Sequence, residues 1–296
     1  MKKLGRLLTA MVTPFNEEGM VDYEQAKRLA LALLRSGSEG LVVSGTTGES
    51  PTLSPEEKLR LFAEVKSVVG KQGTVIAGTG SSSTAVSLGL TKEAERTGVD
   101  ACLLVVPYYN KPTQEGLYQH FKTIAQGTNL PCILYNVPSR TITSLSADTT
   151  TKLSHIDNVI GIKEASSNLD QISKIISSTG DDFPVWSGND SDTLPILTLG
   201  GYGVISVASH LVGNQIREMI NSITSGKVAE AASIHRRLLP LINALFVVSN
   251  PIPVKYALNY LGFNVGKPRL PLTELDEKSA TLIKDTLKNY HIDLPL

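Results

Sequence analysis

The stretch that decides the fold is Val159-Ile160-Gly161-Ile162-Lys163-Glu164-Ala165. A short apolar run rich in β-branched side chains is typical of a strand that is buried on both faces, as in a parallel sheet. This run ends in Lys163, and a lysine is almost never fully buried without a partner or a chemical role. Two interpretations fit the stretch alone. Lys163 pairs with Glu164 or extends its amine out of the strand end, or it is a nucleophilic amine at the mouth of a parallel barrel.

The composition limits the kind of partner that the chain can have. The 296 residues include 28 Lys plus Arg and 28 Asp plus Glu, so the formal net charge is zero. A neutral chain lacks the electrostatic footprint of a protein that binds nucleic acid or an acidic membrane. No apolar run approaches the roughly 20 residues of a membrane span. The first residues resemble a signal peptide only weakly, because Gly5 and Arg6 interrupt a short apolar run. We therefore expect a cytoplasmic protein with no nucleic acid or membrane partner.

Short apolar runs alternate with amphipathic segments along the first three quarters of the chain. A chain of this length suits one large α/β barrel or two smaller domains. Cys102 and Cys132 both lie in such apolar runs, which predicts two core residues rather than a disulfide pair. The expected strands are 7–12, 41–43, 74–77, 101–106, 132–135, 159–163, 185–187 and 204–207.

The number of strand–helix units favours one fold class. Strands that alternate with helices predict a parallel sheet, and eight such units predict a closed (β/α)8 TIM barrel. A doubly wound open sheet is the alternative, but no Gly-x-Gly-x-x-Gly pattern follows the first strand. After residue 226 the strand signal disappears, and 227–248, 253–261 and 274–290 have helical patterns. We expect a catalytic barrel over residues 1–225 and a C-terminal helical extension over 226–296 that packs on it.

Polar residues at the ends of the expected strands are the candidates for a site. In barrel enzymes the active site lies at the carboxyl ends of the strands. The candidates in chain order are Thr46, Thr47, Tyr108, Tyr109, Tyr135, Arg140, Lys163, Gly188, Asn189 and Asp190. The barrel fold would direct these residues toward one cavity.

Lys163 has the strongest chemical signal in this set. Strand alternation places Lys163 and Glu164 on opposite sides of the sheet, so an inward Lys163 means an outward Glu164. Apolar surroundings favour the neutral amine of a lysine, and a neutral amine attacks carbonyl carbons to form a Schiff base. Such chemistry also needs a proton relay, for which Tyr135 and Thr47 are candidates.

The remaining candidates have ordinary interpretations as well. Tyr135 and Thr47 also fit a core phenol and a turn threonine, and Tyr108 and Tyr109 fit surface aromatics. Arg140 fits a surface charge or a clamp for a substrate carboxylate. The five histidines show no metal-binding spacing. Gly78-Thr79-Gly80 lacks the lysine of a phosphate-binding P-loop. We therefore expect no metal and no cofactor beyond a covalent imine on Lys163.

Several motifs in order resemble those of one enzyme family. They are Gly45-Thr46-Thr47-Gly48-Glu49, Pro107-Tyr108-Tyr109-Asn110-Lys111-Pro112, Tyr135-Asn136-Val137-Pro138-Ser139-Arg140-Thr141, Gly161-Ile162-Lys163-Glu164-Ala165, Gly203-Val204-Ile205-Ser206-Val207 and Asn250-Pro251-Ile252-Pro253-Val254-Lys255. Together they resemble the pyruvate-dependent class I lyases, the family of the dihydrodipicolinate synthases and N-acetylneuraminate lyases. The resemblance covers essentially the whole chain.

The resemblance implies a role for each candidate. Lys163 would form the imine with pyruvate, and Tyr135 and Thr47 would relay protons together with a Tyr109 that enters from the neighbouring subunit. Thr46 and Thr47 would hold the pyruvate carboxylate. Arg140 would bind the carboxylate of L-aspartate-4-semialdehyde, and Gly188 and Ile205 would line the pocket. The family is usually a homotetramer built as a dimer of dimers, so Tyr109 would act across the tight dimer.

Two positions favour the synthases within this family. Sialic acid lyases usually carry serine at the position of Thr46 and lack an arginine that matches Arg140. The resemblance thus implies the condensation of pyruvate with L-aspartate-4-semialdehyde to 4-hydroxy-tetrahydrodipicolinate, the committed step of diaminopimelate and lysine biosynthesis. The alternatives are N-acetylneuraminate lyase or a 2-keto-3-deoxy-sugar-acid aldolase, and a non-catalytic barrel that binds keto acids.

One departure from the family concerns regulation. Synthases that lysine inhibits resemble one another at an effector site with a histidine, an asparagine and a glutamate. Lys58, Ser82 and Val86 occupy the matching positions here, whereas Ser50 and Tyr108 are retained. The glutamate that would bind the ammonium group of lysine is missing, and Lys58 would repel that group. We therefore expect weak or absent inhibition by lysine.

Overall fold

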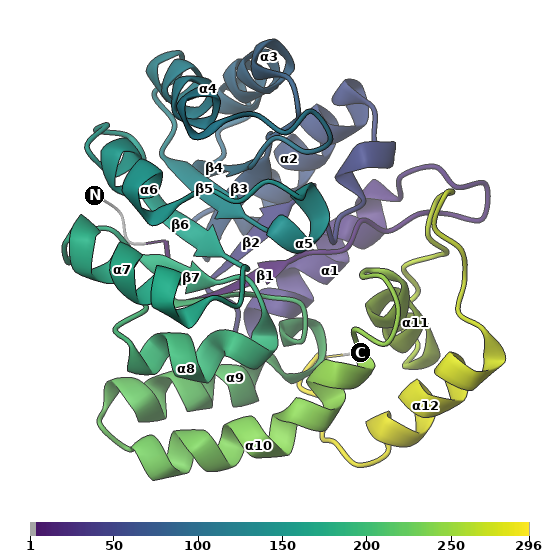
Figure 1. Cartoon of the computed structure of the whole chain (residues 1–296). Coiled ribbons are helices and arrows are strands. Elements are labelled where there is room, and N and C mark those ends of the chain that lie inside the picture. The colour runs from purple at the N-terminus through teal and green to yellow at the C-terminus, as the bar shows by residue number, and fades with distance from the viewer. Residues whose placement is uncertain (1–3, 296) are drawn as a thin grey trace. The chain divides into compact units, whose positions relative to one another are not determined.

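The computed structural model describes residues 4–295, and its eight strands follow one another in sequence order around a closed barrel (Figure 1). Every strand pair whose register is defined is parallel. The predicted (β/α)8 class is confirmed, and each expected strand lies within two residues of an observed one. The strands are β1 (Leu7–Ala10), β2 (Gly40–Val43), β3 (Thr74–Gly78), β4 (Ala101–Val105), β5 (Cys132–Asn136), β6 (Val159–Glu164), β7 (Val185–Ser187) and β8 (Gly203–Ser206).

Strand β6 shows why its sequence suits this place. All six of its residues are buried, as expected for a strand covered on both faces. Gly161 is required by close packing, because a Cβ there would lie 2.6 Å from the Pro184 carbonyl oxygen and 2.7 Å from the Trp186 ring. The absence of a side chain at Gly161 therefore lets β6 approach the residues that lead into and form β7.

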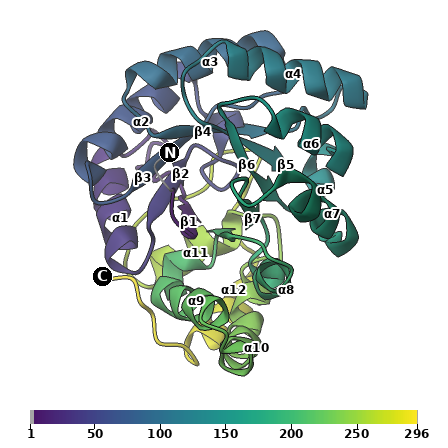
Figure 2. The same cartoon turned by 90° about the vertical axis from the view of Figure 1, so that its left-hand side faces the viewer.

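The chain divides into two compact units, of which one is Ile76–Ile205. In this unit the helices lie along one side of the strands, and neighbouring helices pack in pairs, α3 with α4 and α6 with α7 (Figures 1 and 2). Its helices are α3 (Thr84–Arg96), α4 (Gln114–Gln126), α5 (Pro138–Thr141), α6 (Ala147–Ser154), α7 (Leu169–Thr179) and α8 (Thr193–Thr198), with the 3-10 turn η2 (Asp190–Asp192).

The other unit joins the chain up to Val75 with the chain from Ser206 onward. Here α9 packs on β1 and α1, α10 packs on α9, and α12 packs on α10 and α11. The helical character expected beyond residue 226 is confirmed, whereas the predicted domain boundary there stays a prediction. The helices are α1 (Tyr23–Arg35), α2 (Pro55–Val69), α9 (Ser209–Thr224), α10 (Val228–Ala244), α11 (Ile252–Tyr260) and α12 (Glu277–Leu287), with the 3-10 turn η1 (Ser50–Thr52).

Side-chain caps fix where many of these helices begin. Ser54 accepts a hydrogen bond from the Glu57 backbone N–H while the Glu57 side chain accepts one from the Ser54 backbone N–H, which forms a capping box at the start of α2. Asp22 caps α1 by accepting a hydrogen bond from the Gln25 backbone N–H. Caps of this kind contribute about 1 kcal/mol each to stability. Further caps are Ser83, Thr113, Ser146, Asn168 and Asp276.

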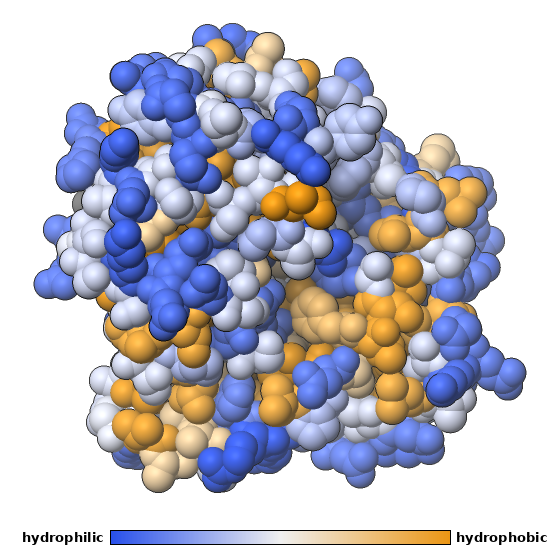
Figure 3. All heavy atoms as spheres, in the orientation of Figure 1, coloured by the Kyte–Doolittle hydropathy of each residue, from blue (hydrophilic) through white to orange (hydrophobic). Residues whose placement is uncertain are grey.

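The core and the surface are ordinary for such a fold. Cys102 and Cys132 are buried and free, with their sulfur atoms 3.5 Å apart on neighbouring strands, so the predicted core role is confirmed. On the face drawn in Figure 3, hydrophobic side chains gather around α11, and Phe246 and Val247 in the segment before it are each 41% exposed. Within residues 4–295, each helix is too short or too polar to cross a membrane.

Candidate functional site

Lys163 and Tyr135 lie side by side at the carboxyl ends of β5 and β6. The two residues face each other in the strand register. The Lys163 amine stands 4.4 Å from the centroid of the Tyr135 ring, within the range of a cation–π contact. Lys163 is 5% exposed and Tyr135 is 6% exposed, so both residues are buried. The structure therefore brings together the predicted nucleophile and the predicted proton-transfer group.

Glu164, the next residue, points away from Lys163. Its carboxylate accepts hydrogen bonds from the Asn136 amide at 3.0 and 3.1 Å, the Ser166 backbone N–H at 2.8 Å and the Gln171 amide at 3.3 Å. Gln171 belongs to α7. The opposite orientation of Lys163 and Glu164 is thus confirmed. Burial raises the pKa of Glu164, and the hydrogen bonds from Asn136, Ser166 and Gln171 partly oppose that rise.

Asn136 connects Glu164 to the next segment of the chain. It faces Glu164 in the strand register and lies one residue after Tyr135. Its side-chain oxygen accepts the backbone N–H of Leu145 at 2.9 Å. Asn136 therefore fixes the β5–β6 register that sets Tyr135 opposite Lys163. We did not single out this residue in the sequence, although an asparagine that ends an otherwise apolar strand is a usable signal.

Gly188 and Ile205 belong to the same unit. The Gly188 backbone N–H donates to the Glu164 carbonyl oxygen at 2.7 Å. A Cβ at Gly188 would lie 2.5 Å from the Ala165 Cβ, so only glycine fits against the end of β6. Ile205 lies on β8 and is fully buried. The structure places Gly188 beside the Lys163 strand, whereas contact of either residue with a substrate stays a prediction.

Arg140 and Tyr109 are exposed residues of this unit. Arg140 belongs to the short helix α5, which starts two residues after β5 ends. Tyr109 is 92% exposed and has a φ of 75°, in the left-handed region that a tyrosine rarely adopts. Both side chains can reach solutes or other molecules, but the roles implied by the resemblance stay predictions.

Thr46 and Thr47 lie in the other unit, in the loop between β2 and η1. Thr47 is 3% exposed, and its hydroxyl oxygen accepts a hydrogen bond from the Asn250 amide at 2.9 Å. Thr46 is half-buried, and its carbonyl oxygen accepts the Glu49 backbone N–H at 3.1 Å. The loop is therefore well ordered by contacts within its own unit. The parts that the two threonines take in binding and proton transfer stay predictions.

The comparisons with known proteins agree over nearly the whole chain. The model of the dihydrodipicolinate synthetase family matches residues 3–290. A 4-hydroxy-tetrahydrodipicolinate synthase of Dehalococcoides mccartyi (strain ATCC BAA-2266 / KCTC 15142 / 195) is 68% identical over 296 residues and covers all of both chains.

Solved structures give the same result. Dihydrodipicolinate synthase DapA-2 of Bacillus anthracis matches with a TM-score of 0.96 and 46% identity, over 98% of this chain and 100% of its own. The enzyme of Cyanidioschyzon merolae, crystallised with lysine bound, matches with a TM-score of 0.95 and 46% identity, over 97% and 98%. The chain belongs to the dihydrodipicolinate synthetase family.

Proposed function

We propose that the chain condenses pyruvate with L-aspartate-4-semialdehyde to 4-hydroxy-tetrahydrodipicolinate through a Schiff base on Lys163. The observation that supports this most directly is the buried Lys163 at the end of β6, whose amine lies 4.4 Å from the centroid of the Tyr135 ring. The family membership and the 68% identical synthase support the choice of reaction. This is the step that commits carbon to diaminopimelate and lysine.

The chemistry requires a lysine and a nearby acid–base group. The Lys163 nitrogen attacks the keto carbon of pyruvate, and loss of water gives an iminium ion. A base then removes a proton from the methyl group. The electron pair of that C–H bond forms a C=C bond while the C=N π pair moves to the positive nitrogen, so the methyl carbon becomes the nucleophilic carbon of an enamine. That carbon attacks the aldehyde, and the amine of the second substrate displaces Lys163 as the ring closes. Tyr135 is placed to move the protons of the first steps.

The other residues supply binding. Thr47 and Tyr109 complete the proton relay, and Thr46 and Thr47 hold the pyruvate carboxylate. Arg140 binds the carboxylate of the semialdehyde, a task that suits the fork of a guanidinium group. Gly188 and Ile205 line the pocket. No metal and no separate cofactor takes part.

Trapping the imine tests this proposal. Reduction with borohydride in the presence of pyruvate should leave a stable adduct on the peptide that contains Lys163. Lys163→Ala should abolish the adduct. Lys174→Ala should keep it, because Lys174 on α7 is exposed and pairs with Asp148 on α6. An unmodified Lys163 in the wild-type chain would rule out this proposal and its sugar-acid alternative together.

Two further variants separate the roles. Tyr135→Phe should lower kcat by roughly 10²–10⁴-fold, as expected for loss of a general acid–base group, while the adduct still forms. Arg140→Ala should mainly raise the KM for the semialdehyde. Unchanged kinetics with that substrate would remove Arg140 from the site.

Related aldol chemistry is the second candidate function, because the same imine serves aldolases that act on sugar acids. The Thr46 and Arg140 positions favour the synthase. Turnover of L-aspartate-4-semialdehyde, N-acetylneuraminate and 2-keto-3-deoxy sugar acids should therefore be compared on one preparation. Faster turnover of either sugar acid would replace the proposed second substrate.

We also propose a homotetramer in which Tyr109 acts across the tight dimer. The 92% exposed ring of Tyr109 on a left-handed backbone supports this, because such a ring is available to a second copy of the chain. Lys163→Ala subunits mixed with Tyr109→Phe subunits should recover activity that neither has alone. No recovery after mixing would place Tyr109 in its own subunit or outside the site.

Weak feedback by lysine is the last part of the proposal. Val86 is 57% exposed and cannot pair with an ammonium group, and Lys58 would repel one. Half-maximal inhibition should need far more than submillimolar lysine. Inhibition at submillimolar lysine would overturn this expectation.

A further inference from the structure

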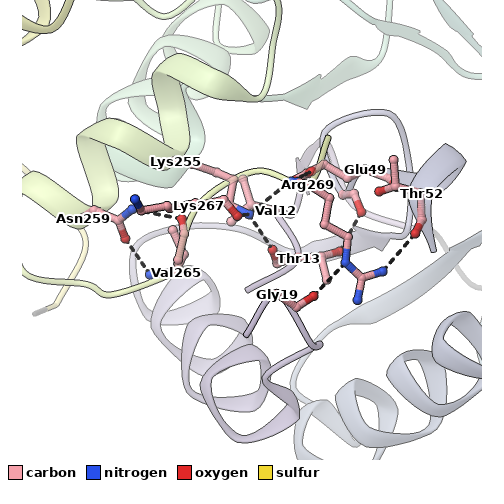
Figure 4. Close-up of polar contacts among 12 residues, drawn as sticks. Val12, Thr13, Gly19, Glu49, Thr52, Lys255, Asn259, Val265, Lys267 and Arg269 are labelled. Carbon is pink, nitrogen blue, oxygen red and sulfur yellow. Dashed lines mark hydrogen bonds and ion pairs between the residues drawn. The ribbon is translucent and has the colours of Figure 1, made fainter. Parts of the chain in front are cut away.

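A buried ion pair lies behind the loop that carries Thr46 and Thr47. The Lys255 amine on α11 stands 2.9 Å from a carboxylate oxygen of Glu49, and the two side chains are 1% and 0% exposed (Figure 4). None of the chemistry proposed for the site uses either charge. Because native proteins are only marginally stable, two fully buried ions need a physical reason.

Lys255 uses all three of its donors. Besides Glu49, its amine donates to the carbonyl oxygens of Thr13 at 3.1 Å and Lys267 at 3.0 Å. It also lies 4.2 Å from the centroid of the Phe15 ring. Burial lowers the pKa of Lys255, and the charge of Glu49 opposes that change. The amine thus joins the end of the first strand, the loop after the second and the C-terminal segment.

Glu49 is fixed from a second direction by Arg269. The other carboxylate oxygen of Glu49 accepts the Arg269 backbone N–H at 2.8 Å. The Arg269 side chain donates to the carbonyl oxygens of Gly19 and Thr52 and pairs with both carboxylate oxygens of Glu57 (Figure 4 shows the Gly19 and Thr52 bonds). Glu49 therefore cannot move without disturbing several elements at once.

The loop that carries Thr46 and Thr47 has a strained residue at each end. Ser44 and Glu49 both have a φ of 56°, in the left-handed region, and they bracket Thr46 and Thr47. Non-glycine residues in this region are strained and persist only where the surrounding contacts over-determine their conformation. The Thr13 hydroxyl adds a hydrogen bond to the Gly48 carbonyl oxygen at 2.7 Å. The buried contacts of Lys255 and Glu49 are of the kind that can hold this strained loop backbone in place.

Stability alone does not explain the pair. A buried ion pair gives little or no net stability compared with apolar residues of the same volume, because both charges lose their hydration. Its advantage is geometry, since each charge fixes several groups at defined distances. A geometric role is consistent with the place of the pair, two residues from Thr47.

We propose that Lys255 and Glu49 are positioning residues that hold the Thr46–Thr47 loop in its reactive conformation. This rests on the proposed function, in which the two threonines bind the pyruvate carboxylate and relay protons. The pair touches no reacting atom and acts through the backbone of the loop. A displacement of about 1 Å in such a group can cost about 10²-fold in rate.

The test measures proton transfer apart from imine formation. Pyruvate alone in D2O should exchange its methyl hydrogens, because the iminium and enamine forms interconvert, and NMR follows the exchange. Lys255→Met should slow the exchange about 10²-fold at saturating pyruvate while borohydride still traps pyruvate on Lys163. The double variant Glu49→Gln/Lys255→Met buries no charge at this pair, so it should unfold near the wild-type temperature. It should still exchange the methyl hydrogens of pyruvate at least tenfold more slowly than the wild-type chain.

A matched control separates this role from general destabilisation. Leu241→Ala removes most of a fully buried side chain of α10 and leaves a cavity, so it should clearly lower the unfolding temperature without touching the loop. Its exchange rate should stay within threefold of wild type. Exchange within threefold of wild type in the double variant, or an equal loss in Leu241→Ala, would overturn the positioning role. No trapping and no exchange in the wild-type chain would instead reject the proposed function.

Discussion

A buried carboxylate supports each of two regions that carry the proposed chemistry, and the two carboxylates are satisfied differently. Glu164, next to Lys163, accepts hydrogen bonds from amide and backbone N–H groups. Glu49, two residues from Thr47, accepts from the ammonium group of Lys255 and from a backbone N–H. Neutral N–H donors stabilise the carboxylate beside Lys163, whereas a positively charged ammonium group stabilises the carboxylate beside the Thr46–Thr47 loop.

The difference follows from what else holds each region. Lys163 lies on a strand whose ladders to β5 and β7 already fix its backbone. Thr47 lies in a loop with strained residues at both ends. The Lys255 ammonium group adds attraction between opposite charges to its hydrogen bond with Glu49, which the neutral donors around Glu164 do not provide. The comparison indicates that charge is used where regular secondary structure does not hold the backbone.

The largest effect should come from breaking the charge pair. Lys255→Met leaves the Glu49 carboxylate buried without its cation, and such losses cost about 3–5 kcal/mol of unfolding free energy. Urea denaturation followed by circular dichroism measures this. The double variant with Glu49→Gln should recover most of the loss, since it removes both charges.

The other region should respond less strongly. Glu164→Gln turns an amide NH2 toward groups that donate, which costs about 1–3 kcal/mol. The adduct on Lys163 should persist, because Glu164 faces away from it. A larger loss in Glu164→Gln than in Lys255→Met would refute the contrast between charge and dipoles.

The same contrast separates what the sequence could predict from what it could not. Short apolar runs that alternate with helical patterns, and the number of these units, predicted the barrel. Strand alternation predicted that Glu164 faces away from Lys163. These are local rules that neighbouring residues determine. Helix caps such as Ser54 are equally local, because Ser54 and Glu57 lie only three residues apart.

The support behind the loop is not local, so no pattern could predict it. Lys255 and Glu49 are 206 residues apart in the chain. An isolated lysine in the apolar helix α11 and a glutamate in a loop each have ordinary surface interpretations. Only the tertiary structure shows that both are buried and paired, and the same holds for Asn250 and Thr47. Domain limits and subunit contacts depend on such long-range packing as well.

Lowering the pH should destabilise the fold through one buried histidine in each unit. Burial lowers the pKa of His120 on α4 and of His210 on α9 to about 4. The folded chain then binds fewer protons than the unfolded chain between about pH 6.5 and 4, so stability falls as the pH falls through this window. The slope should be about 1.4 kcal/mol per pH unit for each histidine near the middle of the window.

Single variants should show which unit contributes. The His210 Nε2 accepts the Val12 backbone N–H at 3.2 Å, so protonation there breaks a contact with the chain just after β1. The His120 Nδ1 is 2.9 Å from the Thr84 hydroxyl, and its buried Nε2 has no hydrogen-bond partner among residues 4–295. Unfolding at pH 7, 6 and 5 should show a shallower pH slope in His120→Gln and in His210→Gln. Slopes equal to wild type would mean that these rings are hydrated in the fold.

The smallest effect should come from relieving backbone strain at one exposed residue. Ile142, two residues from Arg140, has a φ of 64° and is 69% exposed, although a β-branched residue is poorly suited to that backbone. Ile142→Gly should therefore raise the unfolding free energy by about 1 kcal/mol, since the left-handed region costs an L-residue about 1–2 kcal/mol and glycine loses part of that gain in entropy. Glu49→Gly relieves similar strain but removes the partner of Lys255, so it should destabilise the chain. Opposite signs in the two denaturation curves would show that contacts, rather than backbone angles, decide where strain is tolerated, and equal signs would refute this.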